Sequence, residues 1–160
     1  MPLQVVRSVP PAPADTSAFT TLGLARHALI SRASAKCIHF ELMLLAQRGD
    51  PNEPCMPSLL HQVASESIGQ GMRCSAARSS GREVPSCPAV RSRLYTWPPA
   101  YLPDEFAIHQ APGQTTVFAW LVPITASEVT FVREQGWEAF ESRLVEQNPD
   151  LCDWNRPALV

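Results

Sequence analysis

A run of apolar and β-branched residues near the C-terminus constrains the fold more than any other feature of this chain. Residues 115–122 read TTVFAWLV, a pattern that predicts a strand buried in the middle of a sheet, because both of its faces carry apolar or small groups. Pro123 follows and is expected to end the strand, since proline has no N–H to give to a ladder. The chain is therefore expected to build a sheet around this segment.

The residues after this strand predict two helices. Thr125 and Glu128 have the spacing of a capping box, in which the threonine hydroxyl accepts a bond from a backbone amide and the glutamate reaches back to the N-cap amide. A helix is predicted to begin there and to end at Gly136, where glycine tolerates a positive φ. The segment from Trp137 to Leu144 has apolar residues at helical spacing, and Asn148-Pro149 is expected to end this second helix.

Earlier segments complete the expected fold. Alternation of apolar residues predicts a strand over 36–46, and helical spacing predicts a helix over 57–67. Short strands are predicted over 19–24 and 93–97, while 69–92 is rich in Ser, Gly, Arg and Pro and is expected to be mostly loop. Without regular βαβ alternation, this order predicts a single α+β domain, with a mixed, mostly antiparallel sheet packed against a few helices.

The N-terminal residues are expected to stand apart from this domain. Residues 1–15 carry four prolines and no periodic pattern, so the segment is predicted to be an extended arm before a domain over 16–160. It has no apolar signal-peptide core, and no run of about 18 uncharged apolar residues occurs in the chain. We therefore expect a cytoplasmic protein that does not enter a membrane.

Composition excludes several classes of function. The chain has 45% hydrophobic residues and a net charge of −2, so it lacks the basic field that gathers nucleic acid. Its five cysteines are odd in number and never form a C-x-x-C pair, which predicts reduced thiols rather than a disulfide framework or a zinc site. No nucleotide-binding or hydrolase motif is present. We expect no catalytic residue, cofactor or metal.

Cys37 and His39 are the one pair of residues that could carry chemistry. They lie two apart on a predicted strand, so their side chains share a face and could form a Cys/His catalytic or metal pair. Thiolate chemistry needs an activating partner, and metal binding needs further ligands. The sequence marks neither, so a Cys/His-dependent hydrolase is the less favoured alternative.

The C-terminal pattern resembles the suppressor of fused-like domain family. VPIT-x-x-E-x-x-F-x-x-x-x-G-W-x-x-F over 122–140, followed by D-x-x-R-P over 153–157, is the specific part of the likeness. The segments FTTLGL (19–24) and FELML (40–44) are similar to the opening T-x-G-L strand and the E-L strand of the family. The residues expected to specify this fold are Pro123, Ile124, Glu128, Phe131, Gly136, Trp137, Phe140 and Arg156.

This resemblance implies a function in binding. Bacterial members of the family resemble immunity proteins that neutralise a toxin, and eukaryotic relatives hold a transcription-factor peptide. The expected function is therefore a non-catalytic, immunity-type protein that binds a partner toxin; a regulator that binds an extended peptide is the alternative. Binding residues concentrate on loops held by a rigid scaffold, so the partner is expected to contact Arg73, Arg78, Arg82 and Glu83.

Overall fold

The computed structural model describes residues 2–10, 15–27, 29–31, 37–69, 73–74, 93–97 and 107–160. Its strands are β1 (Gln4–Ser8), β2 (Thr16–Leu22), β3 (Leu29–Ser31), β4 (Cys37–Gln47), β5 (Arg73–Cys74), β6 (Arg93–Trp97), β7 (Ile108–Ala111) and β8 (Gln114–Ile124). The α-helices are α1 (Met56–Gly69), α2 (Ala126–Gln135) and α3 (Trp137–Gln147), and two 3-10 turns are η1 (Leu24–Arg26) and η2 (Glu53–Cys55).

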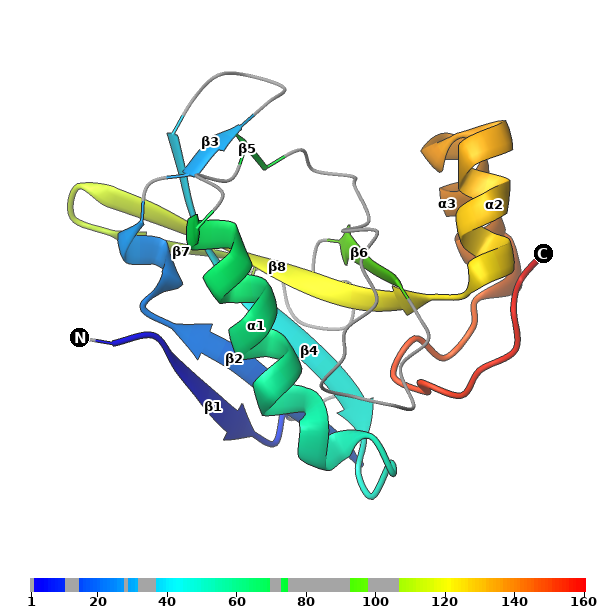
Figure 1. Cartoon of the computed structure of the whole chain (residues 1–160), viewed down its shortest axis with the longest axis horizontal. Helices are drawn as coiled ribbons and strands as arrows, with labels where there is room; N and C mark the ends of the chain where they lie inside the picture. Colours follow the sequence, from blue (N-terminus) through cyan, green and yellow to red (C-terminus); the bar gives the residue numbers. More distant parts are fainter. Residues whose placement is uncertain are drawn as a thin grey trace.

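The two longest strands, β4 and β8, form the centre of the sheet. They run parallel to each other, with Phe40 opposite Val117. β2 and β3 pair antiparallel with β4, β1 pairs with the far side of β2, and β6 and β7 pair antiparallel with β8 (Figure 1). The strand β5 adds to β3 in a parallel pair. The prediction of an α+β fold with a mixed, mostly antiparallel sheet is therefore confirmed.

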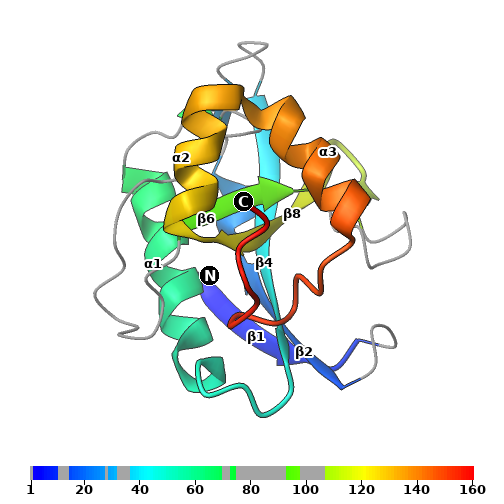
Figure 2. The same ribbon diagram turned by 90° about the vertical axis from the view of Figure 1, so that its right-hand side faces the viewer.

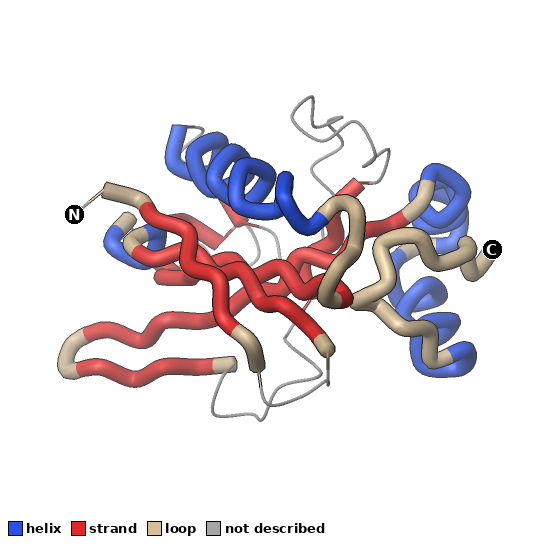
Figure 3. The backbone as a smooth tube through the Cα atoms, turned by 90° about the horizontal axis from the view of Figure 1, so that it is seen from below, coloured by secondary structure: helices blue, strands red, loops and turns tan. Residues whose placement is uncertain are grey.

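The helix α1 covers one face of this sheet, and α2 and α3 pack against one end of the core on the other face. Even-numbered residues of β4, such as Leu42 and Leu44, belong to the core under α1, whereas Met43 and Leu45 belong to the core with Trp120. This separation follows from the period of two along a strand. Figure 3 shows α1 along one side of the sheet, and Figure 2 shows α2 and α3 together where β8 ends, beside the C-terminal segment.

Two sequence-based expectations are wrong in detail. The strand β8 does not stop before Pro123 but continues through it to Ile124, with Pro123 opposite Leu94 of β6. Among the described strands, this end of β8 is paired on one side only, and proline is tolerated in a strand that has an unpaired edge. In addition, Cys55 is disulfide-bonded rather than reduced, whereas Cys37 and Cys152 are free thiols.

Part of the predicted N-terminal arm belongs to the sheet. Residues 4–8 form β1, which pairs with β2 in the register Gln4 to Leu22 through Ser8 to Ala18. This strand lies at the edge of the sheet.

Candidate functional site

The first polar cluster of the molecule surrounds the buried carboxylate of Glu41. The strand β2 stops at Leu22, and the chain turns through η1 before it resumes beside β4 as β3. The three amides of Gly23, Leu24 and Ala25 point into this interruption and donate to Glu41 at 2.9, 3.3 and 3.1 Å. Successive backbone amides form a pocket for an anion, and here an anion of the same chain fills it.

Thr21 closes this cluster. Its hydroxyl donates to Glu41 at 2.5 Å and accepts the amide of Leu42 at 2.8 Å. Glu41 and Thr21 are both buried, so their polar groups replace the ladder bonds that the interrupted strand cannot make. Gly23 has a φ of +105°, which favours glycine at this bend. This hydrogen-bonded cluster therefore joins residues 21–24 to residues 41–42, which belong to the two upstream segments of the resemblance.

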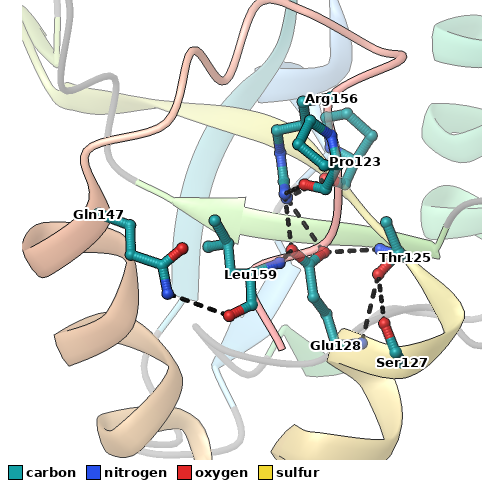
Figure 4. A network of polar contacts seen from close by, with 8 residues as sticks. Pro123, Thr125, Ser127, Glu128, Gln147, Arg156 and Leu159 are labelled. Atoms are coloured by element: carbon teal, nitrogen blue, oxygen red, sulfur yellow. Dashed lines mark hydrogen bonds and ion pairs between the residues drawn. The ribbon is translucent and has the colours of Figure 1, made fainter.

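The second cluster is an ion pair between Glu128 and Arg156. Two nitrogens of the Arg156 guanidinium donate to the Glu128 carboxylate at 2.6 and 3.0 Å (Figure 4). The same carboxylate accepts the amides of Thr125 at 2.7 Å and Leu159 at 3.1 Å. Arg156 also donates to the carbonyl of Pro123 at 3.2 Å. The pair thus connects the start of α2, the end of β8 and the C-terminal segment.

Both side chains of this ion pair are buried. The side chain of Glu128 is 0% exposed and that of Arg156 is 5% exposed. Burial acts to raise the pKa of Glu128, but the Arg156 guanidinium and the two backbone amides hold that pKa below its usual range. The predicted capping box is confirmed. Asp153 is closer to Arg156 in the sequence, but the side chain of Arg156 pairs with Glu128, 28 residues away.

The C-terminal segment is bound to the sheet at two further places. Trp154 donates its indole N–H to the carbonyl of Leu45 at 2.8 Å, and the amide of Gln47 donates to the carbonyl of Cys152 at 3.0 Å. Both acceptor and donor lie beyond Met43, the last β4 residue that pairs with β8. The segment therefore continues along β4 after β8 has left it.

The remaining motif residues pack in the core between β6, β8 and the last two helices. Tyr95 of β6 stacks on Trp137 with ring centroids 4.3 Å apart and contacts Phe140 edge-on at 6.4 Å. Its hydroxyl donates to Glu141 at 2.6 Å. Ile124 and Phe140 are buried and Phe131 is partly buried. Gly136 has the positive φ that the sequence predicts, +88°, with an extended ψ of 169°, and it separates α2 from α3.

The structure gives the Cys/His pair no catalytic surroundings among the described residues. Cys37 is exposed. His39 directs its Nδ1 to the backbone carbonyl of Ala25 at 2.6 Å, which is a structural contact. Within the described ranges, no group of three or more His, Cys, Asp or Glu side chains could hold a metal ion.

The predicted partner-binding residues cannot be placed in this geometry. Arg78, Arg82 and Glu83 lie outside the described residues, and of Arg73 only the backbone, in β5, is described. The described residues do form an open groove of about 430 Å³ between β1 and the first turns of α1, lined by Val5, Pro57, Ser58, His61 and Gln62. The sequence carried no signal for this groove, because it depends on how β1 lies beside α1.

No described helix has the length and apolarity needed to span a membrane.

Comparison with known proteins places this geometry in a family. The model of the suppressor of fused protein (SUFU) family matches residues 1–157. No curated protein sequence matches the chain.

Several solved structures share the fold. A structure described as a SUFU homologue from Neisseria gonorrhoeae is 19% identical with a TM-score of 0.74, and the match covers 99% of this chain and 78% of that chain. A Sufu–Fu complex is 11% identical with a TM-score of 0.67, covering 98% and 76%. Drosophila Suppressor of Fused is 11% identical with a TM-score of 0.64, covering 98% and 42%.

Proposed function

Because this chain belongs to the suppressor of fused family, we propose that it is a non-catalytic protein-binding domain, an immunity-type protein that neutralises a partner toxin by occluding it. The family match over residues 1–157 carries this proposal. A structure with the same fold was solved as a Sufu–Fu complex, so the fold has a member that assembles with another protein.

The use of the buried polar residues supports binding rather than catalysis. Glu41 holds three backbone amides of the η1 turn, and Glu128 holds Arg156 and two further amides. A general acid or base needs a polar atom free to meet substrate, whereas these carboxylates are saturated by their own chain. With His39 bound to a backbone carbonyl, the hydrolase alternative has no positive support in the described part of the chain.

We propose that the partner contacts the Arg- and Ser-rich segment 69–92, through Arg73, Arg78, Arg82 and Glu83. The arginines of this segment can form bidentate bonds with carboxylates of a partner. Binding residues concentrate on loops carried by a rigid scaffold, and the two polar clusters belong to the described scaffold of this chain. Complementary charges at such a surface select the correct partner and act mainly on the rate of association.

The proposal is tested by coexpression with the toxin domain encoded next to this gene. Growth of a bacterial host should be restored by the wild-type chain, and the two proteins should copurify. The charge reversals Arg78→Glu and Arg82→Glu, made together, should abolish rescue. The matched control Arg133→Glu with Arg143→Glu changes two exposed arginines on α2 and α3 and should preserve rescue. No rescue by the wild type would refute the function, whereas rescue by the 78/82 variant would refute only the surface.

A further inference from the structure

The outer edge of β1 is open. Among the described residues, β1 pairs with β2 alone, and no other strand lies on its far side (Figure 1). Within the described part of the chain, the backbone N–H and C=O groups on that side have no strand to pair with. An exposed strand edge is a template for pairing with another chain unless the protein protects it.

This edge lacks the usual protective features. The strand reads QVVRS, with no proline or lysine inside it and with a regular register of five residue pairs to β2. Its one charge, Arg7, is 54% exposed but is paired within its own chain: the guanidinium pairs with Glu53, donates to Ser17 at 3.1 Å and lies 6.0 Å from the ring centroid of Phe19. The edge is therefore nearly neutral toward an approaching strand.

Apart from the Arg7–Glu53 pair, the surfaces that flank this edge present uncharged residues. On the α1 side, the groove is lined by Val5 and by the uncharged residues Pro57, Ser58, His61 and Gln62. On the opposite face, Val6 is 42% exposed and Leu22 is 46% exposed. These two side chains are diagonal neighbours on one face, because Val6 pairs with Thr20, two residues before Leu22. Depletion of charge is the compositional mark of an interface core.

We propose that this surface joins two copies of the chain in a symmetric dimer, through antiparallel pairing of β1 with β1 of the second copy. A two-fold axis at Val6 places Val6 opposite its counterpart, Gln4 opposite Ser8 and Val5 opposite Arg7. No like charges face each other, so the strand is complementary to itself, as an isologous interface requires. Because the axis is perpendicular to the sheet, both α1 helices lie on the same face of the joined sheet.

The register makes the proposal testable by paired charges. Val6→Glu and Val6→Lys each place two like charges at the axis, and each variant is expected to self-associate about tenfold more weakly or worse. An equimolar mixture of the two variants is expected to regain a dimer, because glutamate then faces lysine. Analytical ultracentrifugation over a range of protein concentrations measures all three samples. The recovery in the mixture separates the interface from any loss of folding.

Val145 provides a matched control. It is a 78% exposed valine on α3, far in the sequence from β1, and Val145→Glu should leave the dimer unchanged. A wild-type chain that stays monomeric at high micromolar concentration would overturn the proposal. So would a dimer that persists in both Val6 variants, or a mixture that does not recover. The dimer is independent of the proposed toxin binding, so either result can fail without the other.

Discussion

Removal of Arg156 is predicted to destabilise the domain by more than the loss of a helix cap. If Glu128 served only as part of the capping box, disturbing its surroundings would cost about 0.5–2 kcal/mol. In the structure, however, Arg156 neutralises a carboxylate that is 0% exposed, through bonds of 2.6 and 3.0 Å. Breaking a buried pair by removing one partner costs about 3–5 kcal/mol, since the other charge stays buried and unpaired. We expect Arg156→Met to fall in this higher range.

A double-mutant cycle distinguishes the two explanations. Glu128→Met should also be strongly destabilising, because it leaves the guanidinium of Arg156 without its carboxylate. The double variant should lose less than the sum of the two single losses, since it leaves neither charge unpaired. Urea unfolding, followed by tryptophan fluorescence, gives the free energies of unfolding. Losses below about 1 kcal/mol for each single variant, or strictly additive losses, would refute the reasoning.

The same pair predicts a pH dependence. The folded pKa of Glu128 lies below its usual value, so its contribution to stability is fully present above the unfolded pKa of about 4.3. That contribution is lost as the pH falls through the folded pKa. The difference in unfolding free energy between the wild type and Glu128→Gln should therefore shrink on acidification below about pH 4. A difference that stays constant or grows in acid would contradict this assignment.

Three further predictions concern other parts of the scaffold. Glu41→Gln should lower the free energy of unfolding, measured in urea, by about 2 to 3 kcal/mol, because the amide group cannot accept all the bonds that the carboxylate receives. An unchanged midpoint would refute the structural role of the polar cluster around Glu41. Gly136→Val should cost about 1–3 kcal/mol because φ there is +88°, whereas the control Gly69→Val has open space and no positive φ and should change stability by only about 0.5 kcal/mol. An alkylating reagent at pH 8, followed by peptide mapping, should label Cys37, which is exposed, and spare Cys152, which is buried. Burial, and then the charge of Asp150, raise the pKa of the Cys152 thiol to about 12. Equal labelling of the two cysteines would contradict the burial of Cys152.

Local signals predicted the elements well. The capping box at Thr125 and Glu128, the alternation along β4 and the stop at Asn148 all act within a few residues, so the sequence determines them directly. Pro123 misled the prediction, because whether a proline ends a strand depends on which side of that strand is paired.

Long-range partners could not be predicted in the same way. Glu41 is one of several carboxylates in the chain, and only the return of the η1 turn beside β4 brings three amides to it. Arg156 stands three residues after Asp153, but the tertiary fold brings Glu128 within 2.6 Å of it. The resemblance identified both segments of each cluster as parts of one family pattern, and the structure supplies the contacts that explain why they occur together.

The most direct test of the proposed function is a titration of the purified partner toxin with this chain, with the residual toxin activity as the readout. An occluding binder predicts that activity falls in proportion to the chain added and reaches its minimum at a fixed stoichiometric ratio, unchanged by longer incubation. Loss of activity at substoichiometric amounts that progresses with time would show turnover and contradict a non-catalytic mechanism. Full activity in the presence of excess chain would contradict neutralisation itself.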